Sequence, residues 1–191
     1  MSEKLKILHN FLNKHKYLPV QGSQEWLRSR TETIGGSEIS TILGLNPYQS
    51  IKQLIKQKIG LTTFKKAPPL WFGNIFEYIL QQYTEILFDT HIYETGSIPY
   101  ENSNLIKYSP DGLSVIQNNK LKFLLSKYDI NNKINNVSSF NNIDPLFNNE
   151  LLVLFEFKNP YMRVLKKNEI PVYYINQPRL GMEVINMCEV S

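Results

Sequence analysis

Apolar residues recur at helical spacing in several stretches of the chain: near residues 3–16, 36–43, 50–59, 70–88 and 173–187. Spacings of three and four residues bring side chains to one face of a helix, so we predict an amphipathic helix in each stretch. The segment 70–88 has the most regular pattern, which predicts a long helix packed on the core. On the helix predicted at 50–59, we expect Lys52, Lys56 and Lys58 to form the solvated side, opposite the apolar residues.

Short segments rich in β-branched and aromatic residues follow the long helix, near 92–100, 105–109 and 113–116. Gly, Pro and Asn separate these segments, a pattern typical of antiparallel strands. Residues 151–157 form a nearly continuous apolar run, as expected of a strand that is covered on both faces. The order of elements predicts an α/β fold with a central mixed sheet and flanking helices.

Residues 117–150 interrupt this pattern with five Asn-Asn pairs. Such a composition buries too little apolar surface to offset the entropy lost on ordering. We therefore predict an inserted loop, with local structure only at 121–125, inside a single domain that spans residues 1–191.

Composition and charge narrow the chemistry that the chain can perform. A net charge of +4 suits a polyanionic partner, although many proteins that never bind nucleic acid carry a similar excess. One cysteine and three scattered histidines exclude an internal disulfide and a Cys- or His-based metal site, so any metal must be held by carboxylates. No apolar run approaches the roughly 20 residues of a membrane span, so we expect a soluble, intracellular protein without membrane contact.

Two short polar motifs lie beside the predicted strands. The sequence Ser-Pro-Asp-Gly occupies 109–112, and Glu156, Phe157 and Lys158 end the apolar run. Because successive side chains in a strand point to opposite faces, Glu156 and Lys158 leave the sheet together, while Phe157 faces the other layer. Charges at the end of a buried strand are costly unless they are paired or bind a metal.

Phosphodiester hydrolysis is one explanation of these charges. Mg²⁺ prefers oxygen ligands and is usually held by a few carboxylates together with substrate phosphate, and Asp111 and Glu156 can supply such a pair. Lys158 would then orient the attacking water or stabilise charge on the phosphate. The other explanation is an ordinary Glu-Lys pair at a strand end, beside a common Pro-Asp-Gly turn.

The order of these motifs resembles the signature of the PD-(D/E)XK nucleases, with its Pro-Asp at Asp111, its Glu-X-Lys at Glu156 and Lys158, and an inward-facing Glu77 on a preceding helix. The resemblance implies a restriction-endonuclease-like core. It also implies catalytic roles for these four residues, with Mg²⁺ as the cofactor and Mn²⁺ as a substitute. The implied metal ligands are the carboxylates of Asp111, Glu156 and Glu77 and the backbone carbonyl of Phe157.

An N-terminal segment is similar to the YqaJ and lambda-exonuclease branch of this group. Trp26, Arg30 and the sequence Gly-Gly-Ser-Glu at 35–38 resemble a segment whose Arg and Ser hold DNA phosphate, which assigns that role to Arg30 and Ser37. A serine at a glycine-rich helix start offers free N–H groups and the positive end of the helix dipole to a phosphate. The same serine is also a common helix cap.

A C-terminal segment resembles the same branch. Gln177, three residues after Tyr174 and five before Met182, matches a family Gln that lies beside the active site, whereas Arg179 stands where the family has a second Gln. Pro178 removes a helix hydrogen bond directly after Gln177, so we expect a kinked helix or a displaced Gln177 side chain.

By this resemblance the chain is expected to be a Mg²⁺-dependent exonuclease that digests double-stranded DNA ends from 5′ to 3′ in viral or phage recombination or DNA processing. The implied partners are double-stranded DNA, two further copies in a homotrimer, and a single-strand annealing protein. The implied location is the host cytoplasm or a viral factory. One alternative is an endonuclease of the same fold. The other is a DNA-binding remnant without activity, because the family usually continues where this chain ends.

Overall fold

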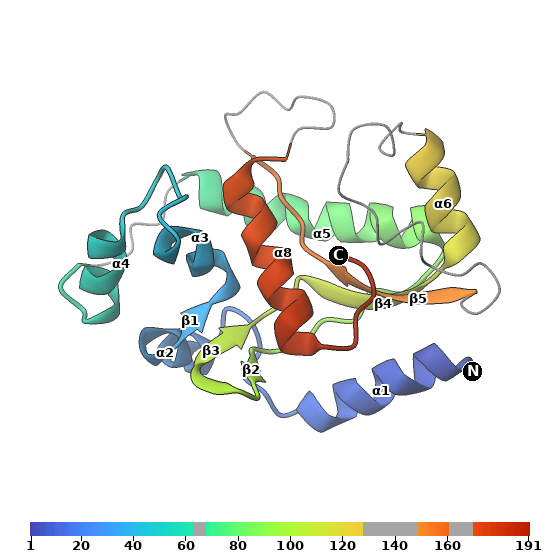
Figure 1. The fold of residues 1–191 in the computed structure, drawn as a ribbon, viewed down its shortest axis with the longest axis horizontal. Helices are drawn as coiled ribbons and strands as arrows, with labels where there is room; N and C mark the ends of the chain where they lie inside the picture. Colours follow the sequence, from blue (N-terminus) through green and yellow to red (C-terminus); the bar gives the residue numbers. More distant parts are fainter. Residues whose placement is uncertain (63–67, 128–148, 161–169) are drawn as a thin grey trace.

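The computed structural model describes residues 1–62, 68–127, 149–160 and 170–191. The predicted mixed α/β architecture is confirmed, with small sheets flanked by helices (Figure 1). The helical elements are α1 (Glu3–His15), α2 (Gln24–Glu32), the 3-10 turn η1 (Gly36–Glu38), α3 (Ile39–Ile42), α4 (Ile51–Lys58), α5 (Pro68–Phe88), α6 (Asn118–Lys127) and α8 (Val172–Ile185). The strands are β1 (Ile34–Gly35), β2 (Ile98–Tyr100), β3 (Ser103–Tyr108), β4 (Gly112–Gln117) and β5 (Glu150–Phe155).

These strands pair in two sheets rather than in the one central sheet that the sequence predicts. The first has the order β1-β3-β2, with β1 parallel and β2 antiparallel to β3, and the second is the antiparallel pair β4-β5. The predicted strand at 92–100 is regular only over Ile98–Tyr100, while Tyr93 makes an isolated bridge to Leu113. Helix α8 contacts β2 and β3 of one sheet and β5 of the other, so it joins them.

The core forms where α1 and α8 meet these strands. The buried side chains at this junction come from both helices and both sheets: Leu8, Ile98, Tyr108, Leu113, Leu152, Leu154, Val184 and Ile185. Strand β5 is buried along Leu151–Leu154, as its apolar run predicts. Burial of this kind removes apolar surface from water and provides most of the driving force for folding.

The sequence prediction lacks helix α2 and gives only part of helix α6, because both helices lie in polar stretches of the sequence. Helix α2 begins at Gln24, directly after Ser23, whose hydroxyl accepts a hydrogen bond from the Trp26 amide and so caps the first turn. Helix α6 occupies the first part of the predicted Asn-rich loop, because Leu121 and Leu124 are buried and the Asn118 amide donates to the Asn149 carbonyl at 2.9 Å. The remaining 128–148 lies outside the described residues, and the single-domain boundary stays a prediction.

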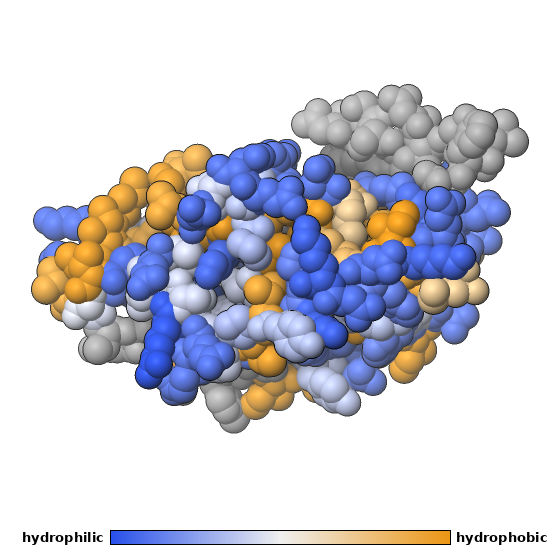
Figure 2. All heavy atoms as spheres, turned by 90° about the horizontal axis from the view of Figure 1, so that it is seen from below, coloured by the Kyte–Doolittle hydropathy of each residue, from blue (hydrophilic) through white to orange (hydrophobic). Residues whose placement is uncertain are grey.

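Helix α4 packs in an unexpected orientation. Lys58 points inward with 18% of its side chain exposed, and Leu54 is the buried apolar residue of the helix. Ile51, Ile55 and Ile59 are 46%, 52% and 63% exposed. Figure 2 shows apolar residues gathered at this end of the molecule. The expectation that Lys58 belongs to a solvated face was therefore wrong. No helix within the described ranges combines the length and the apolar character needed to cross a membrane.

Candidate active site

The β4-β5 pair brings two acidic residues together from distant parts of the chain. Gly112 pairs with Phe155, so Asp111, just before β4, lies beside Glu156, just after β5. The Phe157 amide donates a hydrogen bond of 2.6 Å to Oδ2 of Asp111. The long segment between the two strands therefore does not separate the Pro-Asp motif from the Glu-X-Lys motif.

The Glu156 carboxylate is nearly buried, with 7% of its side chain exposed. Its Oε1 accepts hydrogen bonds from Nζ of Lys158 and Nε2 of Gln177, and its Oε2 accepts one from the Tyr108 hydroxyl at 2.7 Å. Gln177 thus reaches Glu156 from α8, although Pro178 lies inside the same helix. The expected displacement of the Gln177 side chain does not occur.

Burial and neighbouring charge raise the pKa of two carboxyl groups at the site, Asp111 and Glu77. Burial and the negative charge of Glu156 raise the pKa of Asp111 to about 8, against the opposing effects of Lys158 and the Phe157 amide. Burial also raises the pKa of Glu77, which lies on α5 within electrostatic range of Lys158 and Glu156. Carboxylates crowded in this way bind a cation favourably, because the cation relieves their mutual repulsion.

Burial and the Glu156 carboxylate also raise the pKa of Tyr108 above its ordinary value, so the phenol keeps its proton and donates a hydrogen bond to Glu156. The sequence shows Tyr108 only as an aromatic residue at a strand end. A tyrosine three residues before the Pro-Asp-Gly aspartate is the one local signal that it lies near the site.

A divalent cation fits the oxygen donors of this cluster. Nζ of Lys158 already contacts Oε1 of Glu156 and the Phe157 carbonyl oxygen, the latter at 3.4 Å, so an ammonium lies where a positive ion would bind. Asp111, Glu156 and the Phe157 carbonyl are hard ligands of the kind Mg²⁺ prefers. Within the described part of the chain, no three His, Cys, Asp or Glu side chains converge as a metal-binding group, and the role of Glu77 as a third ligand stays a prediction.

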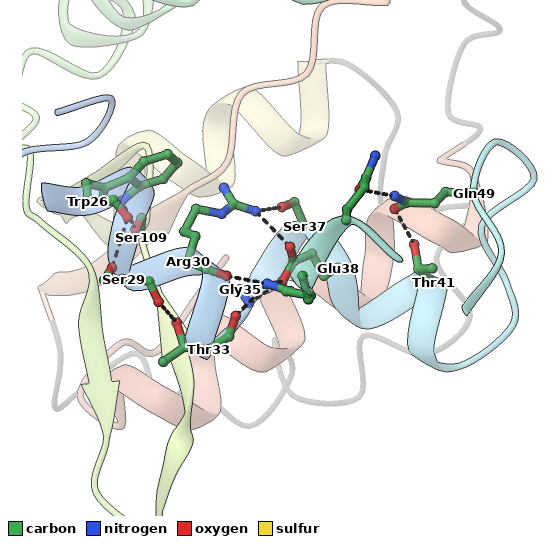
Figure 3. Close-up of polar contacts among 12 residues, drawn as sticks. Trp26, Ser29, Arg30, Thr33, Gly35, Ser37, Glu38, Thr41, Gln49 and Ser109 are labelled. Atoms are coloured by element: carbon green, nitrogen blue, oxygen red, sulfur yellow. Dashed lines mark hydrogen bonds and ion pairs between the residues drawn. The ribbon is translucent and has the colours of Figure 1, made fainter. Parts of the chain in front are cut away.

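The predicted phosphate-binding residues also lie together (Figure 3). Nη2 of Arg30 donates to Oγ of Ser37 at 2.9 Å, and the guanidinium lies 4.7 Å from the centroid of the Trp26 ring. The Trp26 indole in turn donates to the Ser109 hydroxyl at 3.1 Å, two residues before Asp111. Arg30 and Ser37 are thereby connected to the loop that carries Asp111.

A buried ion pair supports this segment. Oε2 of Glu38 accepts hydrogen bonds from Nζ of Lys58 and from the Gly35 amide, each at 2.8 Å. Lys58 also donates to the carbonyl oxygens of Arg30 at 2.5 Å and Thr33 at 2.6 Å. Lys58 thus ties α4 to the end of α2, a role that helical periodicity does not reveal.

The model of the YqaJ-like viral recombinase domain family matches residues 25–187. The chain belongs to this family. The matched range includes Arg30, Ser37, Asp111, Glu156 and Gln177.

Two viral proteins are similar to this family member, one over most of its length and the other over about half. Protein D345L of African swine fever virus (strain Badajoz 1971 Vero-adapted) is 29% identical over 184 residues, which are 92% of this chain and 49% of that protein. Protein R354 of Acanthamoeba polyphaga mimivirus is 28% identical over 94 residues, covering 49% of this chain and 17% of that protein. The match to D345L therefore spans about half the length of that relative.

A solved structure shares the fold. The crystal structure of LHK-Exo in complex with dAMP matches with a TM-score of 0.50 and 14% identity, over 86% of this chain and 70% of that one. At this identity the likeness establishes the fold and leaves the chemistry to the residues of the site.

Proposed function

We propose that this YqaJ-family chain is a metal-dependent deoxyribonuclease, and more narrowly an exonuclease that digests double-stranded DNA ends from 5′ to 3′ in viral recombination or DNA processing. Family membership supports a nuclease role. The observation that carries the proposal is the adjacent, partly buried pair of Asp111 and Glu156 with Lys158 beside it, because this combination suits phosphodiester hydrolysis.

The phosphate-binding residues and the carboxylate pair would act on the same DNA strand. Gly36 directly precedes Ser37, and a Cβ placed on it would lie 3.3 Å from Cγ of Gln177 and 2.5 Å from the Tyr108 ring. Both Gln177 and Tyr108 bind Glu156. Ser37 therefore follows a residue that packs directly on the supports of the carboxylate site.

Each residue has a distinct task in the proposed reaction. Arg30 and Ser37 would donate hydrogen bonds to a phosphate oxygen and so fix the strand. Asp111, Glu156 and the Phe157 carbonyl would hold Mg²⁺, or Mn²⁺ in its place, and a bound ion supplies an acidified water and neutralises charge on the phosphate. Nζ of Lys158 would donate to the attacking water or to a phosphate oxygen and thereby orient the two groups. Glu77 and Gln177 would tune and support the carboxylates.

The test compares an end-labelled linear duplex with a closed circular plasmid, in Mg²⁺ or in EDTA, for the unaltered chain and for Lys158→Ala. We expect Mg²⁺-dependent loss of the linear DNA alone, reduced at least about 100-fold by the substitution, since removal of a group that stabilises the transition state has such an effect. Lys14→Ala is the matched control, because the Lys14 side chain is 67% exposed in a surface ion pair with Glu101.

The other outcomes identify the alternatives. Cutting of the circle would make the chain an endonuclease. A folded chain that binds DNA but cuts neither substrate, with Mg²⁺ or with Mn²⁺, would be a DNA-binding remnant. Labelling the two ends of the duplex separately decides the direction of digestion.

Assembly is a separate part of the proposal. We propose a homotrimer around double-stranded DNA, and a single-strand annealing protein as a partner, on the basis of the family resemblance. Sedimentation of the chain with and without DNA tests the first, and a monomer under both conditions would exclude it.

A further inference from the structure

Tyr108 occupies a fixed position between the two parts of the candidate active site. It is the last residue of β3, its side chain is fully buried, and its hydroxyl donates to Oε2 of Glu156 at 2.7 Å. It therefore contacts a carboxylate that follows a strand of the other sheet.

Two glycines form the slot that holds the Tyr108 ring. A Cβ on Gly36 would lie 2.5 Å from the ring, and a Cβ on Gly181 would lie 2.4 Å from it. Real Cβ atoms do not approach so closely, so any side chain at either position would displace the ring. Gly36 begins η1, and Gly181 lies on α8 one turn after Gln177, so the ring is clasped by the two elements that carry Ser37 and Gln177.

Because Gly36 and Gly181 pack against the Tyr108 ring, the direction of the Tyr108 hydroxyl is fixed. A Glu side chain has a broad terminal torsion, so a carboxylate held at one oxygen can still rotate about its last bond. Lys158 and Gln177 both bind Oε1 of Glu156, whereas Tyr108 binds Oε2. Among the residues that the structure describes, Tyr108 is the hydrogen-bond partner of Oε2. Its hydrogen bond therefore fixes the plane of the Glu156 carboxylate.

We propose that Tyr108 is a positioning residue that presents the Glu156 carboxylate to a divalent cation. This inference rests on the proposed function, because it assigns Glu156 to the metal. Hydrogen bonds to a metal-binding carboxylate orient it, and their loss typically weakens metal binding or activity 10- to 100-fold.

A merely structural role for Tyr108 predicts a different outcome. Tyr108→Phe keeps the ring in its slot and removes only the hydroxyl, so packing alone would leave metal binding unchanged. Tyr100→Phe is the matched control, because Tyr100 on β2 donates to Oε1 of Glu183 on α8 at 2.8 Å, outside the carboxylate cluster. The two substitutions thus remove the same kind of bond in neighbouring strands.

The experiment measures binding of Mn²⁺ and of Mg²⁺ by calorimetry, and then kcat and KM for linear duplex DNA. For Tyr108→Phe we expect metal affinity about tenfold weaker and kcat about tenfold lower at limiting Mg²⁺, with KM for DNA unchanged. For Tyr100→Phe we expect the values of the unaltered chain. Metal affinity and kcat that are the same in both variants would overturn the proposal.

A second measurement needs no substitution. In the unaltered chain labelled with ¹³C at tyrosine Cζ, the Tyr108 resonance should shift when Mg²⁺ is added, because its hydroxyl shares a carboxylate with the ion, whereas the Tyr100 resonance should not. A stationary Tyr108 resonance at saturating Mg²⁺ would overturn the proposal even if Tyr108→Phe fails to fold.

The two proposals fail in different ways. If the unaltered chain cuts no DNA, but binds the metal more tightly than Tyr108→Phe does, the proposed nuclease function fails and the positioning role stands. If the unaltered chain cuts DNA and Tyr108→Phe binds metal equally well, the positioning role fails and the nuclease function stands.

Discussion

The Glu156 carboxylate accepts hydrogen bonds from three side chains, and each comes from a different part of the chain. Lys158 is two residues away, Tyr108 ends β3, and Gln177 lies on α8. Burial and the charge of Glu156 make ionisation of the neighbouring Asp111 costly. The cost at Asp111 is visible in its raised pKa.

The first prediction concerns the pH dependence of stability in EDTA. Burial and the Glu156 charge raise the pKa of Asp111 from 3.8 to about 8, so between these values the folded chain keeps a proton that the unfolded chain releases. The contribution of Asp111 to the free energy of unfolding is therefore largest below pH 3.8 and falls as the pH rises towards 8. Asp111→Asn removes this titration, so we expect a shallower fall, measured by urea unfolding at about pH 5 and about pH 8.

Asp89→Asn is the control for this measurement. The Asp89 side chain is 89% exposed, and its left-handed backbone with φ of 50° is one that Asn tolerates. We expect this variant to keep the pH dependence of the unaltered chain. The same slope in Asp111→Asn would show that Asp111 does not titrate in this range.

At the scale of elements, short segments are oriented by a few buried polar contacts. Helix α4 turns its isoleucines outward and its Lys58 inward, because the ammonium finds two carbonyl oxygens and the Glu38 carboxylate. A buried ammonium with three acceptors has its donors satisfied, which offsets the cost of desolvating the charge.

The second prediction is that Lys58→Met lowers the free energy of unfolding by about 3 kcal/mol, since it leaves the largely buried Glu38 without its main partner. Chemical denaturation measures the change. Lys56→Met, on the exposed side of the same helix, should cost less than about 0.5 kcal/mol. Adding Glu38→Gln to Lys58→Met should restore part of the loss, because it removes a carboxylate charge that would keep only the 3.5 Å ion pair with Arg30. Equal losses at both lysines would contradict the assigned role of Lys58.

At the scale of the whole molecule, tertiary contacts join the phosphate-binding segment to the carboxylate site. Helix α8 touches both sheets and also η1 and α3, and the Trp26 indole bonds to Ser109. Together with the net charge of +4, this arrangement suits a DNA strand that passes Arg30 and Ser37 on its way to Glu156.

The third prediction concerns this path. In EDTA, where binding is measured without cleavage, Arg30→Ala should weaken binding of a short duplex and reduce the slope of log affinity against log salt by about 1, because one phosphate contact is lost. Arg28→Ala removes the same charge from the exposed side of α2 and should leave the slope nearly unchanged. Equal slopes for the two variants, measured by fluorescence anisotropy, would mean that Arg30 contributes only general charge.

Much of the architecture follows from local patterns. The long helix at 70–88 and the buried apolar run that begins at Leu151 could be predicted, because periodicity and residue type depend on near neighbours in the chain. The expected packing of the long helix on the core was wrong, because Ile75, Ile79 and Ile86 are 43%, 52% and 80% exposed. Helix α6 was predicted only as local structure at 121–125, because the Asn-rich composition of 117–150 outweighs the two buried leucines of a short amphipathic stretch.

By itself, the sequence determined which residues are candidates for the chemistry and in what order they occur, because charged side chains at the ends of apolar strands are recognisable from their neighbours alone. Only the tertiary structure decided that Lys58 faces inward, that Gln177 reaches Glu156 past Pro178, and that Tyr108 lies between two glycines. Each of these depends on partners far away in the chain, and the packing of elements, rather than local propensity, selects which partners meet.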